Sequence, residues 1–285
     1  MRTVAILSLK GGVGKTTVVL GLASAALRRG VRTLVVDLDP QCNATAALDP
    51  PDTDASLADV LDDPRQSTLL AAIAASPWGP DLDVLVGSED VEAHNHPDPN
   101  SRRLGKLGKA LERLGGHESL GYQLVLADCP PSLGQLTRSA LVAADRALLV
   151  TEPNMFAVSG VQRAFEAVQA ERQTNNAALQ PLGVLVNRVR PRSYEHQFRI
   201  AELREVFGPL VLPAALPDRL ALQQAQGACC PIHKWSTPGA REAALVFDGL
   251  LGRILRTARA REAEAAARRS AARKATGEQS AHAGG

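Results

Sequence analysis

A glycine-rich segment near the start of the chain constrains the fold most strongly. It reads Lys10-Gly11-Gly12-Val13-Gly14-Lys15-Thr16-Thr17 and directly follows an apolar run at residues 4–9. Glycine allows a positive φ and a close approach of the backbone to a ligand. The residues that follow have the pattern of a helix, whose N-terminus attracts anions. A strand, such a loop and a helix in this order predict a phosphate-binding loop, in which Lys15 contacts the phosphates and Thr16 a magnesium ion.

The loop departs from the usual pattern G-x-x-x-x-G-K-[ST] at its entrance. Leu9 stands where the pattern has glycine, and Lys10 adds a second cation. Two lysines so close together repel each other unless an anion lies between them or one of them points away. Lys10 precedes the glycines, so it need not reach the nucleotide that its own chain holds.

The variant K-G-G-x-G-K-T-T resembles the deviant Walker A motif of the ParA/MinD family of ATPases. In that family two subunits sandwich two ATP molecules, and the early lysine reaches the phosphates of the partner subunit. The resemblance therefore implies catalytic roles for Lys10 and Lys15, ATP and Mg²⁺ as cofactors, and a homodimer that forms across ATP. It implies nucleotide contacts along the whole loop from Gly11 to Thr17.

Two acidic motifs follow later strands. The first is similar to the family's D-x-D-P-Q-x-N-A-T and spans residues 37–45, with Cys42 in place of glycine. The resemblance assigns to Asp39 the positioning of the hydrolytic water and a part in holding the metal. For Asp37 and Asp39 the alternative is capping and turn formation. Asp128 ends another apolar strand before two prolines, the Walker B arrangement that orders a magnesium-bound water.

A late strand ends at Asn187, whose amide offers both a donor and an acceptor, as recognition of an adenine edge requires. The family uses an asparagine at this place for the base, and Pro217 and Asp218 lie in a segment that looks like its adenine loop. From the sequence alone, Asn187 would be a turn residue at a strand end. The family's Glu-Ala-Pro after the adenine loop is replaced by Gln224-Ala225-Gln226.

Apolar, β-branched runs alternate with helical patterns along the chain. The predicted strands are residues 2–7, 33–37, 82–86, 123–127, 146–151, 182–187 and 211–213. The predicted helices are residues 16–29, 45–47, 56–61, 67–74, 104–114, 133–143, 157–174, 194–207 and 240–261. The alternation predicts an α/β fold with a doubly wound, mostly parallel sheet, which binds ligands beyond the carboxyl ends of its strands. We expect an ATPase domain over 1–255 and a basic, Ala/Arg-rich tail over 256–285, partly helical and then disordered.

Composition excludes several classes of protein. Aromatic residues are only 3% of the 285 residues, so the core must be built from Val, Leu, Ile and Ala. The four cysteines show no C-x-x-C spacing, which favours reduced thiols and argues against iron–sulfur carriers. The N-terminus enters a strand at once and leaves no room for a signal peptide. His94 and His96 form a weaker candidate for a metal site than for a solvated loop. We therefore expect a cytoplasmic protein.

An ATPase core of this kind does not determine what the protein binds or moves, which is called its cargo below. ParA-type proteins bind DNA non-specifically when they dimerise on ATP, and such binding needs cations that face phosphates. The chain offers arginines at 188, 190, 192 and 199, with Arg219 further on. Arg192 falls where relatives carry a DNA-contacting arginine, whereas a second such position is Ala221. We predict DNA contacts from Arg188, Arg190, Arg192 and Arg219, and solvated surface arginines are the alternative.

The resemblance predicts a nucleoid-associated DNA-partition ATPase whose hydrolysis a ParB-type centromere-binding protein stimulates. The alternative is a MinD-like ATPase that positions a non-DNA cargo. A MinD-like membrane helix would bury Leu, Phe or Trp in lipid, and after Leu255 the tail offers only alanine, so no membrane contact is expected. The arginines of the tail fit either DNA affinity or solubility. A metabolic, amidotransferase-like relative is a further possibility.

Overall fold

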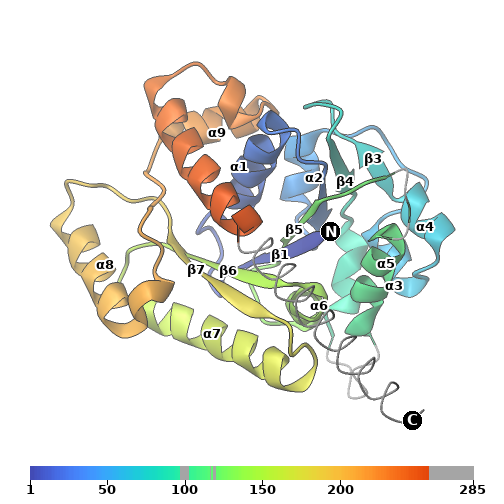
Figure 1. Cartoon of the computed structure of the whole chain (residues 1–285), viewed down its shortest axis with the longest axis horizontal. Helices are drawn as coiled ribbons and strands as arrows, with labels where there is room; N and C mark the ends of the chain where they lie inside the picture. Colours follow the sequence, from blue (N-terminus) through green and yellow to red (C-terminus); the bar gives the residue numbers. More distant parts are fainter. Residues whose placement is uncertain (97–102, 116, 118–119, 257–285) are drawn as a thin grey trace, which may run out of the picture.

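A computed structural model describes residues 1–96, 103–115, 117 and 120–256. Within these ranges one sheet has the strand order β3-β4-β2-β5-β1-β6-β7, and only the β3–β4 pair is antiparallel. Its strands are β1 (Arg2–Leu7), β2 (Thr33–Asp37), β3 (Ile73–Ala75), β4 (Leu82–Leu85), β5 (Leu124–Asp128), β6 (Arg146–Thr151) and β7 (Gln180–Val186). Figure 1 shows helices on both sides of this sheet. The predicted doubly wound, mostly parallel α/β fold is confirmed.

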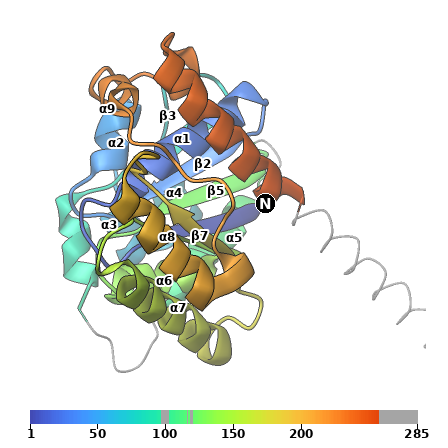
Figure 2. The ribbon, with the colours of Figure 1, turned by 90° about the vertical axis from the view of Figure 1, so that its left-hand side faces the viewer.

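Helices connect the strands and cover both faces. The α-helices are α1 (Lys15–Arg28), α2 (Asn43–Leu48), α3 (Leu57–Asp62), α4 (Gln66–Ala71), α5 (Gly105–Gly115), α6 (Gln135–Ala143), α7 (Ala157–Thr174), α8 (Tyr194–Phe207) and α9 (Leu220–Gly227), and residues 238–256 are also helical. Short 3₁₀ turns are η1 (Glu89–His94), η2 (Gly208–Leu210) and η3 (Ile232–Lys234). In Figure 2, α6, α7 and α8 lie on one side of the sheet and α1, α2 and α9 on the other.

The two faces of the sheet are covered by two separate apolar clusters. Along β1 the side chains alternate, so that Ala5 and Leu7 join the cluster under α3–α8, and Val4 and Ile6 join the one under α1, α2 and α9. The second cluster also includes Phe247 from the helical residues 238–256. The Phe247 ring packs against Gly21 of α1 so closely that any Cβ at Gly21 would collide with it. Glycine in mid-helix therefore lets the C-terminal helix approach the helix that follows the phosphate loop.

The structure corrects three predicted elements. Ile73–Ala75 form the edge strand β3, whereas the alanine-rich sequence predicted the end of a helix at residues 67–74. Pairing with β4 outweighs the helix propensity of alanine here, because local propensity is a weak preference. The predicted strand at 211–213 is reduced to a single bridge between Val211 and Val184, and α9 was not predicted.

The predictions about the basic tail and about membrane contact concern residues that lie partly outside the described ranges. Among the described residues no helix combines the length and the apolarity that a membrane crossing needs. Residues 257–285 lie outside the described ranges, so the domain boundary at 255, the partly helical tail and its basic function stay predictions. All four cysteines are free thiols, and Cys129 is buried.

Candidate functional site

The glycine-rich loop links the end of β1 to the start of α1 at the carboxyl edge of the sheet. Gly12 and Gly14 have φ values of 78° and 89°, a region that side chains other than glycine rarely enter. Gly14 caps α1, and the amide of Val18 is bonded back to the Gly14 carbonyl at 3.0 Å. The first amide groups of the helix are therefore directed out of it, as anion binding requires. The predicted order of strand, loop and helix is confirmed.

A single hydrogen bond joins the loop to the second acidic motif. Thr16 Oγ1 donates to Asp128 Oδ2 at 2.6 Å, across the neighbouring strands β1 and β5. Asp128 is fully buried, and its other oxygen, Oδ1, has no hydrogen-bond partner among the described residues. Burial, together with the charge of Asp37, raises the pKa of Asp128 well above its usual range. A cation beside Asp128 would satisfy the orphaned oxygen and restore the charged form, so the residues fit a magnesium ion.

The two aspartates after β2 differ in their contacts. Asp37 Oδ2 accepts from the backbone N and the Oγ1 of Thr45, at 2.7 and 2.9 Å, and so holds the first turn of α2. The capping alternative is thus confirmed for Asp37. Asp39 is 6% exposed, and among the described residues its side chain accepts from the backbone N of Gln41 alone, at Oδ1 and 3.1 Å. One oxygen of Asp39 is thereby left for a water molecule, as its predicted role requires.

The protein supplies few metal ligands of its own at this edge. No group of three or more His, Cys, Asp or Glu side chains within the described ranges surrounds a common point. Magnesium usually takes one or two protein ligands and completes its octahedron with water and phosphate oxygens. Thr16 and Asp128 are compatible with a site of that kind, together with Asp39, which lies two residues beyond the end of β2.

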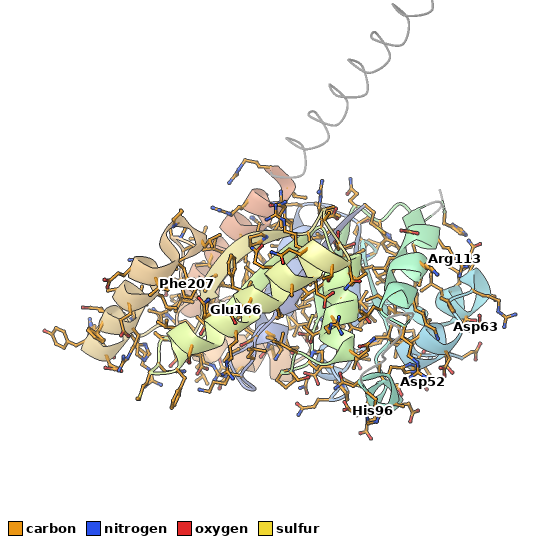
Figure 3. All side chains as sticks on the ribbon, turned by 90° about the horizontal axis from the view of Figure 1, so that it is seen from below. Asp52, Asp63, His96, Arg113, Glu166 and Phe207 are labelled. Carbon is orange, nitrogen blue, oxygen red and sulfur yellow. The ribbon has the colours of Figure 1, made fainter. Side chains whose placement is uncertain are left out.

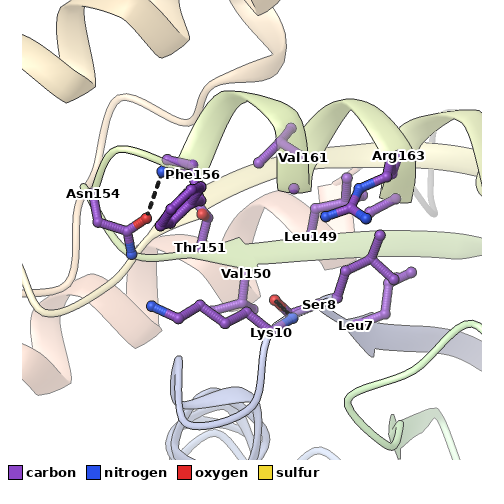
Figure 4. A pocket seen from close by; sticks show the side chains of 14 residues that line it. Leu7, Ser8, Lys10, Leu149, Val150, Thr151, Asn154, Phe156, Val161 and Arg163 are labelled. Atoms are coloured by element: carbon purple, nitrogen blue, oxygen red, sulfur yellow. Dashed lines mark hydrogen bonds between the residues drawn. The ribbon is translucent and has the colours of Figure 1, made fainter.

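The two lysines of the loop have opposite environments. Lys15 is 6% exposed, as expected for a lysine that lies within the phosphate loop. The side chain of Lys10 is 56% exposed, and its Nζ lies 3.8 Å from Glu152 Oε2. Figure 4 shows Lys10 at the rim of a cavity of about 230 Å³ between the ends of β1 and β6 and the start of α7. Lys10 is therefore exposed and paired with Glu152, whereas Lys15 is buried, and the role of Lys10 toward a partner subunit stays a prediction.

Asn187 contacts the loop in a way that the sequence did not reveal. Its Nδ2 donates to the Val13 carbonyl at 2.6 Å, and its Oδ1 accepts from the backbone N of Arg188 at 2.8 Å. A Cβ at Gly14 would collide with the same amide nitrogen. Asn187 thus clamps the phosphate loop and is only 2% exposed. Its adenine role stays a prediction.

The segment predicted to close over the adenine lies next to the end of β7. Pro217 pairs with Val189 in an isolated bridge, and the backbone N of Asp218 donates to the Val189 carbonyl at 3.0 Å. The structure therefore brings Pro217 and Asp218 to the same side of the sheet as Asn187. No contact of these two residues with a nucleotide is tested, and their roles stay predictions.

Three of the four predicted DNA-binding arginines are paired with carboxylates. Arg188 binds Glu152 at 2.7 Å, Arg190 binds Asp218 at 2.8 Å and Arg219 binds Glu242 at 2.8 Å. Arg192 is exposed and forms no ion pair within the described residues. The four positions therefore do not offer equal positive charge to a ligand.

Glu152 is a residue that the sequence reasoning missed. Its two oxygens face two different cations, Arg188 at 2.7 Å and Lys10 at 3.8 Å. It follows β6 directly, and the rule that found Asp39 and Asp128, an acid just beyond a buried strand, would have found it too. Its partners come from distant parts of the chain, so no local pattern indicated the pairing.

The histidine loop gives no support to a metal site. His94 Nε2 lies 3.6 Å from Asp62 Oδ1, and burial lowers the pKa of His94. In Figure 3 His96 lies at the lower edge of the molecule, close to Asp52 in the view and away from Phe207. The described residues here hold no cluster of three metal-binding side chains.

Comparison with known proteins places the chain among ATPases. The family described as "AAA domain" matches residues 1–181. The chain is 32% identical over 267 residues to the chromosome-partitioning ATPase Soj of Thermus thermophilus, which covers 89% of this chain and 97% of Soj. It is 30% identical over 235 residues to the chromosome partitioning protein ParA of Caulobacter vibrioides, covering 81% and 86% of the two chains.

Solved structures show the same architecture. Cobyrinic acid a,c-diamide synthase from Mycobacterium smegmatis, with bound ADP and magnesium, has a TM-score of 0.73 at 26% identity and covers 90% of this chain and 94% of that one. The septum site-determining protein MinD of Pyrococcus horikoshii, complexed with Mg-ADP, has a TM-score of 0.68 at 26% identity and covers 88% and 94%. These similarities extend over nearly the whole described fold.

Proposed function

We infer a function from the premise that this chain belongs to the ParA/MinD family of ATPases. We propose that it is a DNA-partition ATPase of the cytoplasm that binds ATP with Mg²⁺ and forms a homodimer across the nucleotide. In that state it binds nucleoid DNA without sequence preference. A ParB-type centromere-binding protein stimulates hydrolysis and so releases the DNA.

The observation that carries the nucleotide part is the hydrogen bond between Thr16 and Asp128. Thr16 lies at the N-terminus of α1, next to the buried Lys15 in the sequence. Asp128 is a buried acid whose Oδ1 has no hydrogen-bond partner among the described residues. These groups would hold Mg²⁺ and the phosphates, and a bound Mg²⁺ would supply charge neutralisation at the phosphate oxygens. Asp39, with one oxygen free, would orient the attacking water.

The environment of Lys10 supports dimerisation across ATP. Its ion pair with Glu152 is long and solvent-exposed, and such pairs contribute about 0–1 kcal/mol. Lys10 can leave this partner at little cost and reach an anion on a second subunit. The attraction between a lysine and phosphates is stronger in a closed interface than at an exposed surface, because water is excluded there, and it offsets the cost of removing the lysine from water.

The DNA part rests on the partition relatives and on Arg192. Phosphate contacts supply nearly all of the affinity in non-specific DNA binding, and each one requires a cation without a competing carboxylate. Arg192 meets that condition within the described residues, whereas Arg188, Arg190 and Arg219 would first have to exchange their partners.

Co-sedimentation of the full chain with DNA, across a series of salt concentrations, tests the proposal. We expect binding with Mg-ATP or a slowly hydrolysed analogue, no binding with ADP, and an affinity that falls steeply with salt. The variant Lys15→Ala, which cannot hold the phosphates, is the control and should not bind under either condition. If Mg-ATP gives no DNA binding even at low salt, the partition function is wrong and a MinD-like ATPase with a non-DNA cargo replaces it.

A further inference from the structure

Helix α9 reaches the phosphate loop through Gln226, which lies near the end of the helix. The Nε2 of Gln226 donates to Thr17 Oγ1 at 3.0 Å. Leu222 and Ala225 of the same helix are buried in the apolar cluster that α1 also enters. The carboxamide of Gln226 is therefore held against the first turn of α1 by packing on its own helix.

This hydrogen bond restricts the direction of the Thr17 hydroxyl, because it excludes the proton from the side that faces Gln226. A hydroxyl has one proton to donate and two lone pairs to accept with. Because the amide nitrogen of Gln226 can only donate, Thr17 Oγ1 accepts and its own proton must turn elsewhere. Among the described residues the Thr17 hydroxyl donates to no protein acceptor. Thr17 lies in the first turn of α1, where the backbone amides are also directed out of the helix.

We propose that Gln226 is a positioning residue that turns the Thr17 hydroxyl proton toward the bound nucleotide phosphates. The proposal rests on the nucleotide site described under the proposed function. Without Gln226 the hydroxyl can rotate and donate to water or to a backbone carbonyl, and the phosphate loses one oriented donor. With it, the donor is oriented before the nucleotide arrives, so less ordering is needed on binding.

The same contact couples two parts of the site. Helix α9 begins at Leu220, directly after the segment with Pro217 and Asp218. Gln226 ties the far end of that helix to the phosphate loop, so a displacement of α9 removes the donor from Thr17. A movement of the segment with Pro217 and Asp218 that displaces α9 would therefore also change the orientation of the Thr17 hydroxyl.

The test is a double-mutant cycle with nucleotide affinity as its measure. The variants of the full chain are Gln226→Leu, Thr17→Val and the double variant, each titrated with a fluorescent ATP analogue and Mg²⁺. We expect each single variant to weaken binding about tenfold, as for one hydrogen bond to a charged group, and the double variant to be no weaker than Thr17→Val alone. Thr17→Ser, which keeps the hydroxyl, should stay within about twofold of the unmodified protein.

Steady-state kinetics distinguish a lost contact with the nucleotide from a general loss of folded protein. Loss of ground-state binding raises KM and leaves kcat unchanged at saturating ATP, whereas misfolding lowers the amount of active protein and so lowers kcat. Gln224→Leu is the matched control, since Gln224 is exposed on the same helix and should leave KM unchanged. Gln226→Glu should bind more weakly than Gln226→Leu, because a carboxylate accepts the Thr17 proton and repels phosphate.

Three results would overturn the inference. Gln226→Leu with the affinity of the unmodified protein would show that the contact does not serve the nucleotide. Effects of Gln226→Leu and Thr17→Val that add in the double variant would show that the two residues act independently. Gln226→Glu binding as tightly as the unmodified protein would remove the need for a donor. Failure of the unmodified protein to bind ATP would instead contradict the proposed function, and thermal melting of every variant shows that it is folded.

Discussion

Two charged regions of the molecule hold their charges in opposite ways: the phosphate corner, made of Lys15, Thr16, Asp39 and Asp128, and the arginine edge, made of Arg188, Arg190, Arg192 and Arg219. At the phosphate corner Lys15, Asp39 and Asp128 are almost wholly buried, and Thr16 fixes Asp128 at 2.6 Å. At the arginine edge the arginines are partly or largely exposed, and three of the four are paired with carboxylates. Buried charges have few alternative partners and large energies, whereas exposed pairs exchange partners at little cost.

Glu152 belongs to both regions and shows what the difference means. One of its oxygens faces Lys10 of the loop and the other faces Arg188 of the arginine edge. If Lys10 moves to a partner subunit, Arg188 loses a neighbouring cation that competes for the same carboxylate. A move of Lys10 would therefore leave Arg188 as the cation paired with Glu152, whereas the buried contact between Thr16 and Asp128 does not involve Lys10.

The largest effect is expected at Lys10, where the two regions meet. Lys10→Ala should leave ATP binding to the monomer but weaken ATP-dependent dimerisation by about 30-fold to several thousandfold, because truncating one partner of a buried charge pair at an interface costs about 2–5 kcal/mol. Light scattering with Mg-ATP measures the change. Arg163→Ala, which removes another exposed cation from the same cavity, is the control and should dimerise normally. A normal dimer of the Lys10 variant would refute the role of the lysine across the interface.

The second effect concerns the water-positioning carboxylate. Asp39→Ala should still dimerise with ATP, while turnover falls about 100-fold or more, the usual worth of a positioned base. A phosphate-release assay on the dimer measures it. Asp37→Asn, which keeps an oxygen to accept from Thr45, is the control and should retain most of its turnover. Equal turnover in the two variants would place the water elsewhere.

A smaller effect is expected in the stability of the nucleotide-free protein. Burial raises the pKa of Asp37 from 3.8 to about 6. Because the folded chain holds this proton more tightly than the unfolded chain, stability is highest below the unfolded value and falls as the pH rises through the folded one. Asp37→Asn should therefore be more stable than the unmodified protein by up to about 3 kcal/mol at pH 7.5 and by about half of that at pH 5.

Urea unfolding of both proteins at the two pH values, in EDTA, measures this difference. A stability gain that is the same at both pH values would mean that Asp37 does not titrate in this range. A loss of stability at pH 7.5 would mean that the charged carboxylate holds α2 better than the neutral amide does.

The smallest effect separates the arginines from one another. Arg192→Ala should lower DNA affinity severalfold and reduce the slope of log K against log salt by about 0.9, the loss of one phosphate contact. Arg190→Ala should change the slope less, because Arg190 must first leave Asp218. Equal slopes for both variants would show that the ion pairs of the free protein do not limit DNA binding.

Much of the phosphate corner follows from local sequence. The glycines, the buried strand and the helix that follows are contiguous, so the loop could be recognised without any tertiary contact. Asp128 was predicted because an acid after an apolar strand must lie at the carboxyl edge of a parallel sheet. The hydrogen bond of Thr16 to Asp128 then follows from the adjacency of β1 and β5, whereas the cap that Asp37 provides for Thr45 joins residues only eight positions apart.

Contacts between distant segments could not be predicted in this way. Asn187 lies 174 positions from Val13, and Gln226 lies 209 positions from Thr17. Nothing in either local pattern indicates the other, because such pairs depend on how whole helices and strands pack. The edge strand β3 was missed for the same reason, since only its pairing with β4 makes an alanine-rich segment extended.

The sequence by itself determined the α/β class, the position of the phosphate loop and the presence of two lysines in it. These features rest on periodicity and on adjacent residues, whose physics is local. The tertiary structure decided where the second lysine rests, which arginines are neutralised and which residue orients Thr17. Those outcomes depend on distances between groups far apart in the chain, and only the packed fold sets such distances.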